Sequence, residues 1–273
     1  MRTITKIAKI IGIGFVVTVV LSPLVWVFLT SLKDFKSIMV GKIFFFQPLL
    51  DNYTYLLAQE DFLKMLVNSA VVALSTTFVA VAVGVLAAYE IVRYKLIGNL
   101  NSFILGWLLL IRMIFPITLA IPLYDLLRSY NLINTRIALV LAYTILNVPY
   151  AVWILQTFLR SIPVELEEAA KVDGCSELGA FLRIVLPIVK PGLGVASIFV
   201  FIFSWNEFLF ALILTSTSKA MTLPVGIARQ FQQYFVQWGP MAAAISIFIT
   251  PIFILALVAQ KHLLKGLTFQ MLK

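Results

Sequence analysis

Residues 66–89 read LVNSAVVALSTTFVAVAVGVLAAY, a run of 24 residues without a single Asp, Glu, Lys or Arg. As an α-helix this run rises about 36 Å, which exceeds the roughly 30 Å hydrocarbon core of a bilayer. A spanning segment must satisfy its own backbone hydrogen bonds in lipid, and a helix does so. The run therefore predicts a transmembrane helix.

Similar apolar runs recur along the whole chain, and together they predict six membrane spans. The spans cover about 10–31, 66–89, 100–122, 137–159, 188–214 and 239–260. Hydrophobic residues make up 62% of the 273 residues and charged residues only 12%, about half the share in soluble domains. A soluble fold could not bury that much apolar surface. We expect an all-α, polytopic membrane protein whose residues 1–273 form a single transmembrane domain.

The basic residues indicate how the chain is oriented. With both termini inside, twelve Lys and Arg residues fall on inner segments and seven on outer loops, with Lys64 at a membrane boundary. This bias predicts a multi-pass membrane protein with both termini cytoplasmic. Contact of inner loops with anionic lipid accounts for the net charge of +9. No basic run is interleaved with aromatics, so we expect no nucleic-acid partner.

The inner segment at about 160–187 separates the fourth and fifth predicted spans. From 161 to 192 the sequence is SIPVELEEAAKVDGCSELGAFLRIVLPIVKPG. Ser161 is a candidate N-cap ahead of Pro163 in a first helical turn. Three acids follow where the helix macrodipole favours negative charge: Glu165, Glu167 and Glu168.

A glycine divides this segment into two short amphipathic helices. Leu166, Ala169 and Ala170 share a shallow face at i, i+3 and i+4, and Gly174 suits a left-handed helix stop. A second helix is predicted from about Ser176. Its apolar stripe has the spacing i, i+3, i+4 and i+7: Leu178, Phe181, Leu182 and Val185.

Two interpretations of this helical hairpin stay open from periodicity alone. One is a cytoplasmic docking platform that another protein approaches closely across the alanines. The other is a hairpin lying in the lipid headgroups. Three closely spaced acids beside an anionic leaflet favour the docking platform.

The same segment resembles a known family. Its residues match the motif E-A-A-x3-G-x9-I-x-L-P of ABC-importer permeases at seven specified positions: Glu168, Ala169, Ala170, Gly174, Ile184, Leu186 and Pro187. The chain is similar to the carbohydrate branch, specifically to the smaller permease that is the second maltose-permease subunit. PLLDNYTYLL (48–57), AYEIVRYKLIGN (88–99) and FSWNEFLFAL (203–212) carry that similarity. The likeness fails in the tail, where residues 269–273 replace a glycine-rich end.

The resemblance implies a complex of several proteins in the cytoplasmic (inner) membrane. The partners would be a second homologous permease subunit, two ATP-binding subunits, an extracytoplasmic solute-binding protein and a sugar substrate. The motif at Glu168 to Gly174 would insert into a cleft on an ATP-binding subunit and couple nucleotide-driven closure to transport. The resemblance leaves the solute open among maltose, trehalose, other oligosaccharides and glycerol phosphates.

The residues that this chain lacks indicate that ATP binding and hydrolysis belong to other subunits. The chain has no G-x-x-x-x-G-K-[ST] loop, so we expect no enzymatic activity here and place ATP and Mg²⁺ on the partner subunits. One cysteine, Cys175, and one histidine, His262, leave no catalytic set of Ser, His and Asp. They also leave no expected metal site or cofactor on this chain.

Five residues of polar or amphipathic character lie inside predicted spans, where charge is costly and faces a cavity or a partner. They are Arg112, Asn147, Trp205, Asn206 and Glu207. One interpretation is a translocation path that hydrogen-bonds a polyhydroxylated solute, with Trp205 stacking on a sugar ring. The other is that these side chains brace helices or the partner subunit.

A transporter of another class is the rival hypothesis. A secondary transporter or channel working alone is expected to carry ion-coupling carboxylates deep in its spans. Glu207 is the only convincing carboxylate of that kind, and Glu90 lies at a membrane edge.

Overall fold

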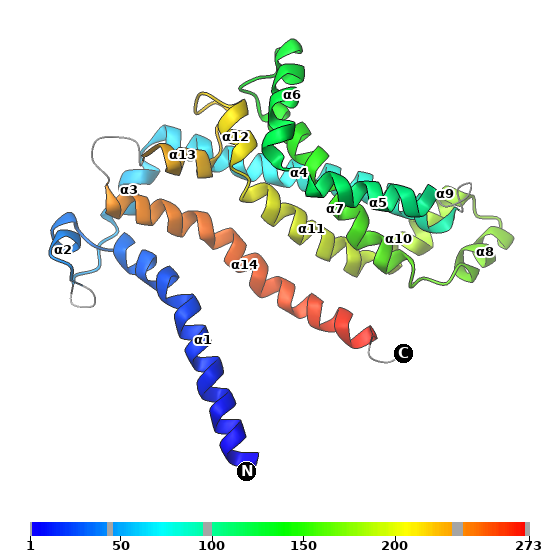
Figure 1. The fold of residues 1–273 in the computed structure, drawn as a ribbon, viewed down its shortest axis with the longest axis horizontal. Helices are drawn as coiled ribbons and strands as arrows, with labels where there is room; N and C mark the ends of the chain where they lie inside the picture. The colour runs from blue at the N-terminus through cyan, green and yellow to red at the C-terminus, as the bar shows by residue number, and fades with distance from the viewer. Residues whose placement is uncertain (1, 43–45, 95–99, 231–236, 271–273) are drawn as a thin grey trace. The chain divides into compact units, whose positions relative to one another are not determined.

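The computed structural model describes residues 2–42, 46–94, 100–230 and 237–270, and all of its regular elements in these ranges are helices (Figure 1). They are α1 (Arg2–Ser31), α2 (Phe35–Met39), α3 (Asp51–Leu57), α4 (Glu60–Arg93), α5 (Leu100–Met113), α6 (Pro116–Ser129), α7 (Arg136–Leu159), α8 (Glu165–Val172), α9 (Glu177–Ala180), the π-helix η1 (Phe181–Val185), α10 (Leu186–Ile188), α11 (Lys190–Trp205), α12 (Leu209–Leu214), α13 (Leu223–Gln230) and α14 (Trp238–Gln270). The predicted all-α class is confirmed.

Four helices in the described ranges are long and apolar enough to cross a membrane. They are Lys9–Ser31 of α1, α4, α7 and Trp238–Val258 of α14. The segment Glu177–Ile188 and helix α11 form a fifth candidate if they count as one span, although they are bent by 73°. The predicted count of six spans is therefore not confirmed.

The span predicted over about 100–122 is interrupted in the structure. Helix α5 ends at Met113, and α6 begins at Pro116 after a short break. A proline has no N–H to donate and its ring clashes with the preceding turn, so Pro116 opens a new helix at its first position. Each helix has 14 residues, so neither is long enough to span a bilayer alone.

The span predicted over about 188–214 is also interrupted. Helix α11 ends at Trp205, and α12 begins at Leu209. The break contains Asn206 and Glu207, two of the polar residues that the sequence places inside a span. Pro149, by contrast, lies inside an unbroken α7.

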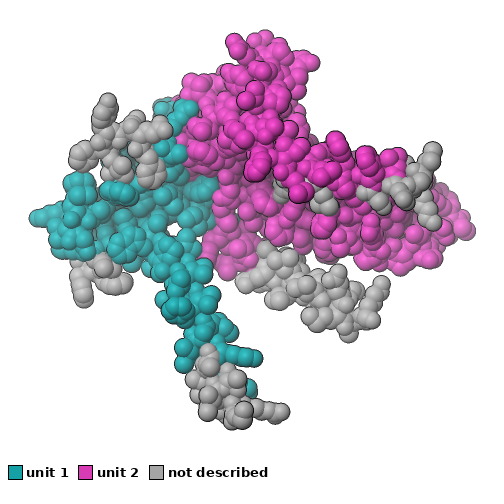
Figure 2. Space-filling view, viewed as in Figure 1, with its two compact units in different colours: residues 1–63, 226–251 teal, residues 64–225, 252–273 magenta. Residues whose placement is uncertain are grey.

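The chain forms two compact units (Figure 2). Unit 1 holds residues 1–63 and 226–251, and unit 2 holds 64–225 and 252–273. In unit 1, Asn52 of α3 donates hydrogen bonds to the carbonyl oxygens of Ser31 (2.8 Å) and Lys33 (2.9 Å). The single domain expected from the sequence stays a prediction.

Unit 2 is built on close contacts of α7 with α4 and with α11. A Cβ added at Gly84 of α4 would lie 2.7 Å from the Cβ of Ala151. One added at Gly192 of α11 would lie 2.6 Å from Cγ of Phe158. These two glycines therefore let helix backbones approach closely, as small residues do in membrane helix packing.

Candidate functional site

The hairpin predicted in the inner segment is present in unit 2. Helix α8 runs from Glu165 to Val172, and the chain turns at Gly174 with a φ of 85°, in the left-handed region that favours glycine. Ser176 then caps α9, because its Oγ accepts a hydrogen bond from the backbone N–H of Gly179 at 3.1 Å. The glycine turn and the start of the second helix are thus confirmed.

The predicted cap of the first helix is wrong. Ser161 Oγ donates to the carbonyl of Phe158 in the last turn of α7, at 2.7 Å. Helix α8 begins at Glu165 after Val164, which makes no side-chain cap, so Pro163 precedes the helix. The hydroxyl of Ser161 therefore adds a hydrogen bond to a carbonyl in the last turn of α7 and does not cap an N–H at the start of α8.

The two sides of α8 differ in burial. Glu167 and Ala170, at i and i+3, are buried in unit 2. Leu166, Glu168 and Ala169 are exposed, so the predicted face of Leu166, Ala169 and Ala170 is split. The exposed side remains shallow because Ala169 lies at its middle.

The predicted stripe on the second helix is half correct. Phe181 and Val185 are buried, whereas Leu178 and Leu182 are 64% and 50% exposed. Residues 181–185 form a π-helical turn, closed by the hydrogen bond from the N–H of Leu186 to the carbonyl of Phe181. This extra residue per turn shifts the register that the α-helical spacing assumes.

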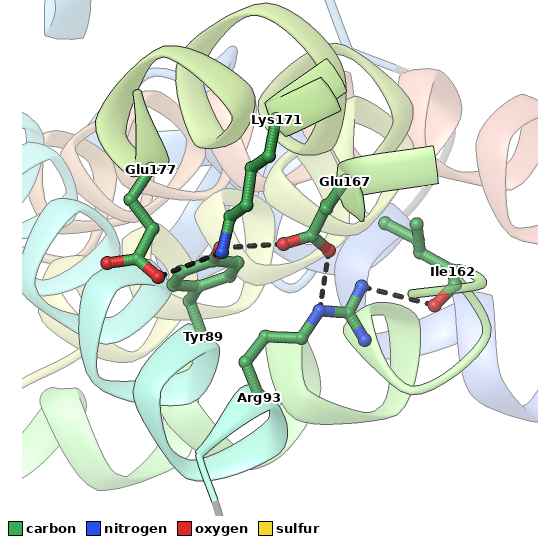
Figure 3. A network of polar contacts seen from close by, with 6 residues as sticks. All are labelled: Tyr89, Arg93, Ile162, Glu167, Lys171 and Glu177. Atoms are coloured by element: carbon green, nitrogen blue, oxygen red, sulfur yellow. Dashed lines mark hydrogen bonds and ion pairs between the residues drawn. The ribbon is translucent and has the colours of Figure 1, made fainter. Parts of the chain in front are cut away.

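Glu167 lies at the centre of a buried polar network (Figure 3). Its Oε1 accepts a hydrogen bond from Nε of Arg93 and its Oε2 accepts one from the hydroxyl of Tyr89, both at 2.6 Å. Arg93 also donates from Nη2 to the carbonyl of Ile162 at 3.1 Å. The side chains of Arg93 and Glu167 are only 7% and 5% exposed.

This arrangement joins elements that are distant in the chain. Tyr89 and Arg93 belong to the last two turns of α4, and Glu167 to α8, 74 residues beyond Arg93. The Tyr89 ring also packs on Phe181 of η1, with 4.8 Å between ring centroids. The end of α4 therefore holds both helices of the hairpin.

Sequence reasoning missed the network. It assigned Glu167 to the favourable field of the helix N-terminus and counted Arg93 only as an inner basic residue. A usable signal was present, because Glu167 lies three residues before Ala170, on the side of α8 that packs inward. The partner across 74 residues carries no such local signal.

A second ion pair of the hairpin is exposed. Lys171 Nζ donates to Oε1 of Glu177 at 2.9 Å, and the side chains are 44% and 57% exposed. Water screens such a pair, so it contributes little to stability.

The last residue of α11 and the break between α11 and α12 hold three of the five polar or amphipathic residues predicted in the spans. Glu207 caps α12, because its two carboxylate oxygens accept hydrogen bonds from the N–H groups of Phe210 (2.9 Å) and Ala211 (3.2 Å). Asn206 is exposed and donates to the carbonyl of Ile202 in its own helix at 2.8 Å. Trp205 is buried and stacks on Phe201, with 5.5 Å between ring centroids.

The other two residues lie elsewhere in unit 2. Asn147 is buried in α7 and donates to the carbonyl of Tyr143 at 2.8 Å and to Oγ of Ser204 at 3.4 Å. Arg112 belongs to α5, but its side chain lies outside the described part of the protein.

Solved structures with a similar fold are ABC importers. A bacterial ABC transporter that imports the acidic polysaccharide alginate matches 95% of this chain and 96% of its own, with a TM-score of 0.80 and 19% identity. The MetNI methionine ABC transporter in an inward-facing conformation matches 74% of this chain and 96% of its own, with a TM-score of 0.55 and 19% identity. At these identities the likeness establishes the fold.

Relatives in sequence extend over almost the whole chain. The trehalose transport system permease protein SugB of Mycobacterium tuberculosis is 37% identical, covering 93% of this chain and 92% of its own. The sulfoquinovosyl glycerol transport system permease protein SmoH of Agrobacterium fabrum is 36% identical, with coverages of 91% and 87%. The trehalose/maltose transport system permease protein MalG of Thermococcus litoralis is 33% identical, with coverages of 100% and 98%.

The family comparison agrees with these relatives. Residues 80–268 match the family described as binding-protein-dependent transport system inner membrane component. The matched region includes the buried network and the whole α8–α11 segment. The chain belongs to this family and is a membrane-spanning permease subunit of an ABC importer.

Proposed function

We propose that the chain translocates a sugar or a related small polyhydroxylated solute across the cytoplasmic membrane. The printed names of relatives at 33–37% identity support this, because each describes transport of a sugar or a sugar-containing glycerol compound. The rival is a secondary transporter or channel that works alone. The family match and the importer fold weigh against that rival.

The proposal includes the partners of the complex. The chain pairs with a second homologous permease subunit, and two separate ATP-binding subunits supply hydrolysis with ATP and Mg²⁺. An extracytoplasmic binding protein delivers the solute, in keeping with a related alginate transporter solved with its alginate-loaded periplasmic protein. Both termini lie on the cytoplasmic side, as the Lys and Arg distribution favours.

The observation that carries the proposal is the exposed side of α8. Glu168 and Ala169 of the seven-position motif lie on this side, while Glu167 on the opposite side is held in unit 2. A helix that is anchored on one side and shallow on the other is suited to insertion into a cleft of another protein. We propose that α8 docks there on an ATP-binding subunit.

For the polar residues of the spans, the hydrogen bonds favour bracing over solute contact in two cases. Glu207 directs both carboxylate oxygens at backbone N–H groups, and Asn147 donates to α7 and to Ser204. The exposed Asn206 is the better candidate for the translocation path, beside Trp205. Arg112 stays a candidate from the sequence alone.

Affinity purification of the tagged chain from its native membrane tests the proposal. We expect a second permease and an ATP-binding subunit to co-purify, with ATP hydrolysis that rises when a sugar-loaded binding protein is added. Ala169→Trp, which adds bulk to the docking side, is expected to lose the ATP-binding subunit, whereas Lys171→Ala retains it. A wild-type chain that purifies alone and without ATPase activity contradicts the proposal.

A further inference from the structure

Helix α8 is attached to the rest of unit 2 in two different ways. Along the chain, residues 160–164 lead into it from α7, and the Gly174 turn leads out of it toward α9. Across the fold, the carboxylate of Glu167 is bonded to Arg93 and Tyr89 of α4. The attachment across the fold involves a helix that is not α8's neighbour in the sequence.

The geometry of this attachment leaves α8 little freedom against the end of α4. Each oxygen of Glu167 has a different donor, and Arg93 also holds the carbonyl of Ile162 just before α8 (Figure 3). A rotation of α8 about its own axis would separate the two charges. Because both side chains are buried, neither water nor salt can replace the lost partner cheaply.

The end of α4 is in turn fixed to the start of α5. Asn101 Nδ2 donates to the carbonyl oxygens of Ile91 and Tyr94, both at 2.8 Å. These are backbone groups of the last turn of α4 and of the residue just after it. A displacement of α8 is therefore transmitted to the end of α4 through Glu167, and from there to the start of α5 through Asn101.

We propose that the Arg93–Glu167 ion pair, supported by Tyr89, is the joint through which α8 moves α4 when the ATP-binding subunits close. The inference rests on the proposed function and assigns Arg93 and Tyr89 as positioning residues for coupling. An ion pair that is costly to separate keeps two helix ends together as one rigid body while the rest of the fold rearranges.

The test measures solute uptake and ATP hydrolysis together, in proteoliposomes that contain the purified importer complex and its binding protein. We expect Arg93→Ala to keep its ATP-binding subunits and hydrolyse ATP while uptake per ATP falls about tenfold. Lys171→Ala removes the exposed ion pair of the same hairpin and is expected to leave uptake per ATP unchanged. Wild-type uptake per ATP in Arg93→Ala would overturn the inference.

A charge exchange separates coupling from a structural contribution to folding. Arg93→Glu and Glu167→Arg are each expected to uncouple hydrolysis from uptake, and the double variant is expected to recover about a third of the wild-type ratio. A double variant that stays as uncoupled as the single variants would overturn the pairwise joint. If Arg93→Ala does not accumulate, Tyr89→Phe serves instead, with an expected fall of about threefold because Arg93 still holds Glu167.

Different results would contradict the proposed function and the role of the Arg93–Glu167 pair. A wild-type complex without ATP-dependent uptake contradicts the proposed function, and with it this inference. A tightly coupled wild-type complex whose Arg93 and Tyr89 variants are equally coupled overturns the joint alone.

Discussion

Glu167 and Glu207 are two carboxylates of unit 2 whose oxygens are both bonded, but to different kinds of partner. Glu167 is bonded to side chains of α4, and its partner Arg93 is 74 residues away. Glu207 is bonded to the backbone N–H groups of Phe210 and Ala211 at the start of the next helix. The first carboxylate joins two distant helices through their side chains, and the backbone hydrogen bonds of the second cap α12.

The difference predicts what each residue can transmit. A cap moves with the helix that it caps, so the two hydrogen bonds of Glu207 to backbone N–H groups stabilise α12 locally. A pair between α4 and α8 constrains how those helices move relative to each other. Substitutions at and around the two sites therefore test whether the two carboxylates differ in this way.

The largest effect is expected from Glu167→Ala. It leaves the guanidinium of Arg93 buried without its carboxylate, which costs roughly 3–5 kcal/mol of unfolding free energy. Thermal unfolding of the purified protein in detergent measures the loss. A decrease no larger than that of Glu207→Ala would remove the distinction between the two carboxylates.

Gly174→Val tests the attachment of α8 along the chain. The φ of 85° is unfavourable for a β-branched residue, by about 1–2 kcal/mol, although no other atoms crowd the site. We expect transport to be abolished because the turn changes course and displaces α8. Gly174→Asn, which tolerates this conformation, is the matched control and is expected to transport. Wild-type uptake by the valine variant at normal membrane levels would contradict the role of the turn.

Glu207→Ala is expected to cost about 1 kcal/mol, the usual value for a lost helix cap. Glu207→Gln keeps one acceptor oxygen and is expected to cost less. Uptake per ATP should remain at the wild-type value in both variants, because the capping hydrogen bonds lie within residues 207–211. Uncoupling by Glu207→Gln without loss of stability would show that this carboxylate does more than brace α12.

The smallest effect is expected from Glu177→Gln, which removes the exposed pair with Lys171. A surface pair contributes 1 kcal/mol or less, so stability and uptake should both stay close to wild type. A loss of stability comparable to that of Glu167→Ala would mean that burial does not make the two ion pairs of the hairpin differ in strength.

Sequence reasoning succeeded where the signal is local. The apolar runs predict α7 to within one residue at each end and the middle of α4, which extends beyond the predicted 66–89 in both directions. Gly174 and Ser176 mark the turn and the second helix of the hairpin. These features depend on hydrophobicity, backbone strain and capping within a few residues.

Sequence reasoning failed where packing between distant elements or an unusual helical turn determines the structure. The period of 3.6 residues placed Leu178 and Leu182 in the core, but both are exposed, and residues 181–185 form a π-helical turn. The apolar run over about 100–122 continues across Pro116, so hydrophobicity alone did not predict that a new helix, α6, begins there. The pairing of Arg93 with Glu167 depends on how α4 and α8 meet in space, which no local pattern of this sequence encodes.

The most direct test is uptake of radiolabelled sugar into proteoliposomes that hold the purified complex, with the ion gradients collapsed. We expect uptake to require both ATP on the side of the ATP-binding subunits and the solute-binding protein. Uptake by this chain alone, driven by an ion gradient and indifferent to ATP, would contradict it.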